Sequence, residues 1–199
     1  NRIMNSASDL KSLIIQHAED AELSKDGMIN DGIIATKLGL QGIPISAELL
    51  IIERDLTLLE YNNCRYHIAQ ISSANSVDII RERKNKVNFS CGVSINNLSL
   101  NENDIGDFKT FLKLSPPLRT ETDRNALVQG LNDKTIDVIV SDHKPEDEEN
   151  KRLTFAQAET GASGIETLLP LSLELYHNGS VELETIIKAL TSKPAEILK

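Results

Sequence analysis

The chain has 199 residues, of which 40% are hydrophobic and 26% are charged, a composition typical of a soluble globular domain. This composition excludes an intrinsically disordered chain and a collagen-like repeat. Lys and Arg number 21 against 30 Asp and Glu, and the resulting net charge of -9 disfavours binding to nucleic acids or to anionic membranes.

The ends and the cysteines of the chain favour a cytoplasmic protein. The longest apolar stretches, such as 136–140, are far shorter than the ~20 residues of a membrane span. The polar start Asn1-Arg2-Ile3 is not a signal peptide, and the missing initiator Met fits a piece of a longer chain. Because Cys64 and Cys91 lack metal-site spacing, we expect two buried, reduced thiols.

Short apolar runs alternate along the chain with longer segments of helical spacing. The first run, 13–15, predicts a buried strand that leads into the polar segment 16–20. A glycine-rich passage follows, and Pro44 then opens a predicted helix with one apolar face. The apolar positions of this helix are Ile45, Leu49, Ile52, Leu56 and Leu59.

Three further strands and several helix signals follow. The strands are predicted at 66–71, 87–93 and 136–140. Ser72 and Ser73 mark the start of a helix between the first two of them. Thr120 with Asp123 has the spacing of a capping box, and Ser163 with Glu166 repeats it before a helix that runs towards His177. The acidic run 146–149 predicts a solvated loop.

This alternation of strands and helices predicts an α/β fold with a parallel sheet of right-handed crossover units. We expect residues 1–199 to form part of one domain, because no internal boundary, repeat or low-complexity segment interrupts them.

Polar side chains follow three of the predicted strands. His17 follows the first, Gln70 lies near the end of the second, and Asp142 with His143 follows the fourth. Loops at the carboxyl ends of parallel strands converge, and imidazole and carboxylate are zinc ligands. Taken singly, each histidine is more often a structural residue. Spacings of the HExxH, GxSxG, P-loop and GxGxxG types are absent, which removes the commonest competing enzyme classes.

Six segments, taken in order, resemble the dihydroorotases, cyclic amidohydrolases of pyrimidine biosynthesis built on a (β/α)8 barrel. They are 16–20, 38–44, 114–119 with Asp123-Arg124, 136–143, 164–170 and 192–198. The resemblance implies that the chain contains strands and helices five to eight of a TIM-like barrel. Four parallel strands cannot close a barrel. The other half would therefore come from another segment, another chain or a dimer face.

The resemblance also implies a chemistry. The family uses two zinc ions bridged by hydroxide to open the ring amide of dihydroorotate, or to close N-carbamoyl-L-aspartate in reverse. By position, His17 and Asp142 would bind metal, and Asp142 would also shuttle the proton. Substrate contacts would fall on Asn96, His143 and Glu146.

Several positions depart from the family pattern. Gln70 stands where the family has a zinc-binding His, and a neutral amide is a poor zinc ligand. We expect His67, three residues away on a strand, to face the opposite side. Asn96 replaces a family His, and Glu146 places an acid near an anionic substrate, which is repulsive unless that acid is protonated or paired. Nothing matches the His-x-His pair of the family's first strand or the metal-bridging Lys or Asp of its fourth.

Three hypotheses follow. The first is the carboxyl-terminal half of a zinc-dependent dihydroorotase-like hydrolase, inactive as this chain alone and expected to be a homo-oligomer. The second, favoured by Gln70, Asn96 and Glu146, is a noncatalytic homologue that acts as a structural partner of aspartate carbamoyltransferase. The third is a structural α/β fragment, which scattered positions of His17, Gln70 and Asp142 would support.

Overall fold

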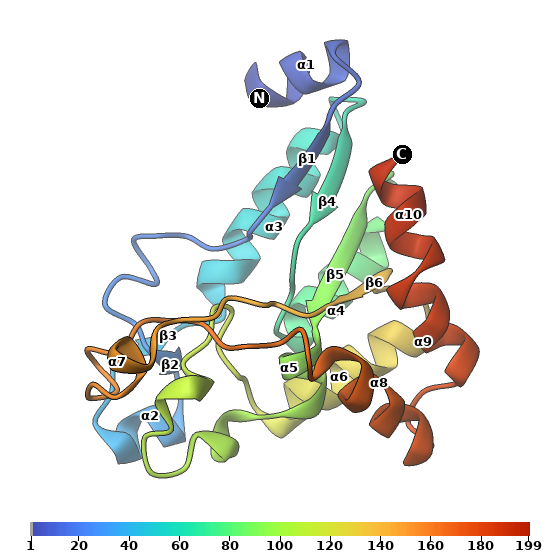
Figure 1. The fold of residues 1–199 in the computed structure, drawn as a ribbon. Coiled ribbons are helices and arrows are strands. Elements are labelled where there is room, and N and C mark those ends of the chain that lie inside the picture. The colour runs from blue at the N-terminus through green and yellow to red at the C-terminus, as the bar shows by residue number, and fades with distance from the viewer. Residues whose placement is uncertain (1) are drawn as a thin grey trace.

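A four-stranded parallel sheet, covered by helices on one face, forms the centre of the molecule (Figure 1). The computed structural model describes residues 2–199, and the strand order is β1-β4-β5-β6. Each strand is parallel to its neighbour, as right-handed crossovers through helices require. The predicted α/β class is therefore confirmed. The strands are β1 Leu13–Gln16, β4 Arg65–Ile68, β5 Ser90–Ser94 and β6 Val138–Val140.

Three helices pack on the outer face of this sheet and bury the main hydrophobic core. They are α3 (Ser46–Leu59), α4 (Ala74–Arg83) and α6 (Glu121–Asn132). Leu56, Ile80 and Leu127, one from each helix, are fully buried in this core. Each such side chain contributes roughly 1.5–3 kcal/mol relative to an exposed position. The apolar face predicted for the first of these helices is confirmed at Ile52, Leu56 and Leu59, which are buried in the core. The helix begins at Ser46 and not at Pro44, so Ile45 lies at its N-cap, and Leu49 is only partly buried.

The two cysteines lie in this core as predicted. Both Cys64 and Cys91 are buried and unpaired with each other. Burial raises the pKa of the Cys91 thiol to about 12, and its Sγ donates to the carbonyl oxygen of Thr135 at 3.2 Å. Cys91 is therefore a small hydrophobic residue with a weak hydrogen bond, and not a reactive thiolate.

A small module lies beyond the carboxyl ends of the strands, at the lower left of Figure 1. It contains β2 (Ile29–Asn30), β3 (Gly42–Ile43) and α2 (Ile33–Leu38). The sequence predicted only a glycine-rich passage here. The module has its own buried cluster, made of Ile29, Ala35, Ile105, Leu114, Leu118 and Phe155.

Arg119 connects this module to the end of β4. Its Nη1 donates to Asn30 Oδ1 at 2.8 Å and to the carbonyl oxygen of Ile43 at 2.7 Å, and its Nε donates to Ser72 Oγ at 3.1 Å. Ser72 in turn donates its backbone N–H and its hydroxyl to the buried carboxylate of Glu48 on α3. Arg119 and Glu48 are each 3% exposed. A buried charged network therefore fixes the segment that follows Gln70.

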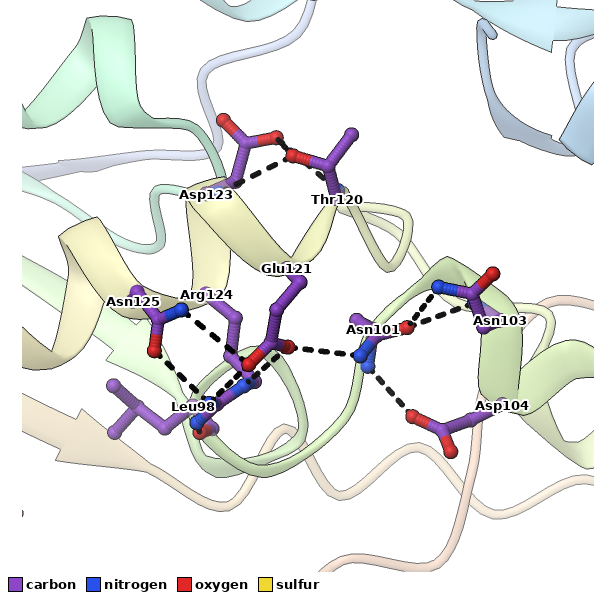
Figure 2. A network of polar contacts seen from close by, with 9 residues as sticks. All are labelled: Leu98, Asn101, Asn103, Asp104, Thr120, Glu121, Asp123, Arg124 and Asn125. Atoms are coloured by element: carbon purple, nitrogen blue, oxygen red, sulfur yellow. Dashed lines mark hydrogen bonds and ion pairs between the residues drawn. The ribbon is translucent and has the colours of Figure 1, made fainter. Parts of the chain in front are cut away.

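Helix α6 begins with the predicted capping box. Asp123 accepts from the Thr120 backbone N–H at 3.1 Å, and Thr120 Oγ1 accepts from the Asp123 N–H at 3.3 Å (Figure 2). Glu121 joins this turn to a preceding loop by accepting from Asn101 Nδ2, and it also accepts from Arg124 Nε within α6 (Figure 2). Satisfying backbone N–H groups at a helix start is worth about 1 kcal/mol.

The second predicted capping box is wrong. Helix α8 (Leu168–His177) begins after Thr167, with no side-chain hydrogen bond at its cap. Ser163 and Glu166 lie in the preceding loop, where the Gly164 N–H donates to His143 Nδ1 at 3.1 Å. This long-range contact sets the loop conformation in place of a local capping box.

The remaining helices lie around the sheet and the small module (Figure 1). Five of them are α1 (Arg2–Asp9), α5 (Ile95–Ser99), α7 (Glu148–Lys151), α9 (Leu183–Leu190) and α10 (Ser192–Leu198). Two 3-10 helices lie at Glu102–Ile105 and Thr110–Leu112. Helix α10 coincides with the predicted closing helix, and α7 occupies part of the acidic run that was predicted as a loop. Helices able to cross a membrane were not found between residues 2 and 199.

Strand β1 is an edge strand, as a half-barrel of four strands implies. Ile15 was expected in a buried strand, but its side chain is 54% exposed. In residues 2–199, β1 pairs only with β4, so one side of β1 and the inner face near Ile15 remain open. The strand at 66–71 is also shorter than predicted, since β4 ends at Ile68.

Candidate functional site

The predicted site residues follow the carboxyl ends of the sheet strands. His17 follows β1, Gln70 lies two residues beyond β4, and Asp142 follows β6. The small module and the loop around α7 border the same end of the sheet (Figure 1). The structure thus places these three residues on one side of the molecule, and the scattered arrangement that a structural fragment would favour is absent from residues 2–199.

Gln70 and Asp142 are in direct contact. Gln70 Nε2 donates to Asp142 Oδ1 at 2.8 Å, although 72 positions separate the two residues in the sequence. Asp142 has a φ of 50°, in the left-handed region that Asp tolerates better than most residues. Gly164 lies against this turn so closely that an added Cβ would be 2.0 Å from the Ser141 carbonyl oxygen. The backbone and the amide together hold the Asp142 carboxylate.

His17 lies between an acid and a hydroxyl. Its Nε2 is 3.2 Å from Glu19 Oε2 and 3.1 Å from Ser115 Oγ, and the Ser115 hydroxyl donates to Glu19 at 3.0 Å. The hydrogen bond to Glu19 is the main cause that raises the pKa of His17, and the charge of Asp142 adds to it. The same hydrogen bond lowers the pKa of Glu19 to about 2. The arrangement favours an imidazolium ion at His17.

His143 is fixed by backbone groups. Its Nδ1 accepts from the N–H of Gly164 at 3.1 Å and from the N–H of Ile165 at 3.3 Å. Since Nδ1 is an acceptor, a neutral His143 ring carries its proton on Nε2. This nitrogen is the one that remains for a ligand.

Glu146 has an ion-pair partner. Its Oε1 is 3.5 Å from Lys144 Nζ, and its side chain is 19% exposed. From the sequence we expected this carboxylate to repel an anionic substrate unless the acid is protonated or paired. The pairing with Lys144 supplies the compensating positive charge.

Asn96 and Asn97 are buried at the start of α5. Asn97 Nδ2 donates to the carbonyl oxygen of Pro117 at 3.0 Å. Within residues 2–199, Asn96 Nδ2 and Asn97 Oδ1 have no hydrogen-bond partner. Of the three predicted substrate contacts, only His143 lines the cavity beside Asp142, and neither Asn96 nor Glu146 does.

A cavity of about 390 Å³ opens beside Gln70 and Asp142 on the inner face of the sheet. It is mostly apolar and extends to the carboxyl-terminal helix α10. His67 and Gln70 both line it, so the expectation that they face opposite sides is wrong. The strict alternation of a strand does not extend to Gln70, because β4 ends at Ile68. The lining residues are Ile15, His67, Ala69, Gln70, Val138, Val140, Asp142, His143, Pro194, Ile197 and Leu198.

The side chains present in the described chain do not fit a zinc site. No three His, Cys, Asp or Glu side chains between residues 2 and 199 are grouped so as to hold a metal ion. His17 Nε2 contacts Glu19 and Ser115, and Asp142 Oδ1 accepts from Gln70. Zinc sites require at least three protein ligands with free lone pairs. Residues 2–199 therefore supply no complete set.

The sequence did not identify Glu19, Ser115 and Lys144 as partners of the site. Ser115 is 98 residues away from His17, and no local pattern indicates that long-range contact. Glu19 lies two residues after His17 within the polar segment 16–20, and this acid-imidazole spacing was the available signal. Lys144 lies two residues before Glu146, and the opposite charges of the two side chains were the available signal for their ion pair.

Comparison with known proteins identifies relatives along the whole chain. A family model described as Dihydro-orotase-like matches residues 2–76. The dihydroorotase of Ehrlichia canis (strain Jake) is 44% identical over 195 residues, which cover 97% of this chain and 44% of that protein. The dihydroorotase of Anaplasma phagocytophilum (strain HZ) is 42% identical over 200 residues, which cover 100% of this chain and 45% of that protein.

A solved structure shows the same fold. The L-hydantoinase (dihydropyrimidinase) of Arthrobacter aurescens superposes with a TM-score of 0.85 at 24% identity, over 98% of this chain and 45% of its own. The chain thus spans less than half the length of the relatives it matches. Its four strand and helix units are a partial TIM-like barrel, as predicted. Over nearly its whole length the chain is therefore similar to the dihydroorotases, and its fold is that of part of a barrel.

Proposed function

We propose that this chain is the carboxyl-terminal half of the barrel in a dihydroorotase-like cyclic amidohydrolase of pyrimidine biosynthesis. Such an enzyme interconverts dihydroorotate and N-carbamoyl-L-aspartate. The observation that carries the proposal is the meeting of Gln70 and Asp142 beside a cavity at the carboxyl ends of β4 and β6. In TIM-like barrels that end of the sheet is where active sites lie.

Asp142 is the residue that we propose for proton transfer. Its Oδ1 accepts from Gln70, which leaves Oδ2 to exchange a proton with the substrate. His143 lines the same cavity and would offer its Nε2 proton to a substrate oxygen. Glu146, paired with Lys144, would border the substrate, and Asn96 would contact it only through a rearrangement of α5.

Part of the machinery must come from outside this chain. Four strands leave the sheet open, and residues 2–199 hold no complete metal site. The zinc implied by the resemblance, with His17 and Asp142 as ligands, therefore stays a prediction for the complete protein. Homo-oligomerisation and a cytoplasmic location are likewise predictions.

Dihydroorotate hydrolysis by the complete protein tests this function. We expect activity in the complete protein and none in the 199-residue chain. Asp142→Asn should lower kcat by about 10²–10⁴, the usual contribution of a general acid or base. Asp107→Asn, at an exposed loop position, is the matched control. An inactive complete protein, or one that Asp142→Asn leaves fully active, would contradict the proposal.

The Gln70 contact also favours a second candidate, a noncatalytic homologue. Residues 2–199 hold no complete metal site, and Gln70 donates a hydrogen bond to the Asp142 carboxylate, an arrangement that suits a scaffold as well as an enzyme. We propose aspartate carbamoyltransferase as the partner in that case. Size-exclusion chromatography of the two purified proteins should then show co-elution, and separate elution at micromolar concentrations would count against this candidate.

A further inference from the structure

We propose that the side-chain amide of Gln70 takes the place of a metal ion at Asp142, so that this chain does not bind zinc through that carboxylate. The inference goes beyond the proposed function, because it concerns ion binding by the chain itself and not turnover of a substrate. Three observations support it.

The first is the direction of the Gln70 amide. An ionised carboxylate only accepts hydrogen bonds, so the group that faces Asp142 Oδ1 at 2.8 Å must be the Nε2–H of Gln70. The positive end of the amide dipole therefore points at this oxygen. A zinc ion on the lone pair of Oδ1 that this N–H occupies would displace the amide, and an ion on Oδ2 would find no group of three His, Cys, Asp or Glu ligands in residues 2–199.

The second is that Asp142 needs no ion to hold its orientation. Gly164 packs directly on the backbone of Ser141 and Asp142, with no room for a side chain. The adjacent His143 is anchored by the N–H groups of Gly164 and Ile165. With Gln70 on its carboxylate, Asp142 is held from both the backbone side and the side-chain side.

The third is that each nearby histidine already has one ring nitrogen engaged by other groups of the protein. His17 Nε2 is engaged by Glu19 and Ser115, and His143 Nδ1 by two backbone N–H groups. His67, which lines the same cavity, has its Nδ1 2.8 Å from Ser90 Oγ. Rotating Gln70 to offer its Oε1 would break the bond to Asp142 and supply only a neutral oxygen. The part of the chain that the structure covers thus favours the amide over the ion.

Calorimetric titration of the 199-residue chain with zinc chloride tests the inference. We expect no saturable binding that depends on Asp142 in the natural chain. Gln70→His should bind zinc at least tenfold more tightly than Gln129→His, which makes the same change at an exposed position of α6. Adding Asp142→Asn to Gln70→His should remove the gain. Zinc binding by the natural chain that Asp142→Asn abolishes, or equal affinity of the two histidine variants, would overturn the proposal.

A second measurement keeps the test valid if Gln70→His does not fold. The side-chain NH₂ resonance of Gln70, assigned by its loss in Gln70→Ala, can be followed by ¹⁵N NMR. We expect it to shift in Asp142→Asn, because its acceptor changes, and to stay in place when zinc chloride is added to the natural chain. A zinc-induced shift that Asp142→Asn prevents would show that the ion displaces the amide, and the proposal would fail.

Discussion

The protonation of His17 is coupled to that of Glu19. The hydrogen bond between the two side chains raises the pKa of His17 from 6.5 and lowers that of Glu19 from 4.5 to about 2. The Glu19 contribution to stability is present above pH 4.5 and is lost as the pH falls through about 2. The His17 contribution is complete below pH 6.5 and is lost as the pH rises through the raised pKa. The pair therefore stabilises the fold most between pH 4.5 and 6.5.

Glu19→Gln should lower the pKa of His17, because it removes the charge that favours the imidazolium ion. An NMR titration of the His17 ring protons measures this directly. The loss of stability should stay below about 1 kcal/mol, since the pair is partly exposed to solvent. Glu22→Gln, at an exposed position of the same loop, should leave the titration unchanged. An identical His17 titration in both variants would disprove the assignment.

The turn at Asp142 leaves no room for a side chain at position 164, where the residue is Gly164. Gly164→Ala would place Cβ 2.0 Å from the Ser141 carbonyl oxygen, and backbone cannot yield as a flexible side chain can. We expect a loss of about 1–3 kcal/mol in the free energy of unfolding, as for other overpacked sites. Gly32→Ala is the control, because its Cβ would lie 3.5 Å from Asn30 Nδ2, an ordinary contact. Equal urea midpoints for the two variants would contradict the prediction.

At the scale of the elements, sequence patterns predicted a helix correctly where the contacts that fix it are between residues close together in the sequence. The apolar face of α3 and the Thr120 box of α6 were predicted because each depends on residues within a few turns. Ser163 has the same local signal, but the contact between Gly164 and His143, 21 positions apart, overrides it. Strands β2 and β3 have two residues each, too few to show a periodicity.

Arg119 carries the connection between the small module and the end of β4, and removing its charge should be costly. Arg119→Met would leave Asn30 Oδ1 and the Ile43 carbonyl without their donor, and the buried Glu48 without a nearby cation. Breaking a buried charged network from one side costs about 3–5 kcal/mol. Urea denaturation should show this loss, with a smaller one for Arg119→Lys.

The control for Arg119 is Arg152→Met, because the Arg152 side chain is 76% exposed in its pair with Glu148. That change should alter the free energy of unfolding by less than about 0.5 kcal/mol, the usual range for surface substitutions. If Arg119→Met were as mild, the network would be a solvated contact and not a structural link.

At the scale of the whole molecule, the number and order of the strands were predictable, and the contacts across the site were not. The order of motifs gave four barrel strands, and the sheet has four in a parallel arrangement. The meeting of Gln70 and Asp142 depends on the loops that follow β4 and β6, whose paths no periodicity encodes. The exposure of Ile15 likewise depends on what lies beside β1, which is a property of the assembled sheet.

An open sheet edge with an exposed isoleucine predicts self-association of the isolated chain. Ile15 is 54% exposed on β1 and borders the apolar cavity, so a second copy would gain by covering it. Ile15→Lys places a charge there and should raise the dissociation constant at least tenfold. Burying one such side chain is worth roughly 1.5–3 kcal/mol, and about 1.4 kcal/mol is a factor of ten.

Sedimentation equilibrium over a range of concentrations measures this effect. Ile187→Lys on α9 is the matched control, because Ile187 is 51% exposed but lies away from the open edge. We expect the natural chain and the control to gain mass together with concentration, while Ile15→Lys stays smaller. A natural chain that is monomeric throughout would show that the β1 edge is protected without a partner. If both lysine variants raised the dissociation constant equally, the effect would come from the change in net charge and not from this edge.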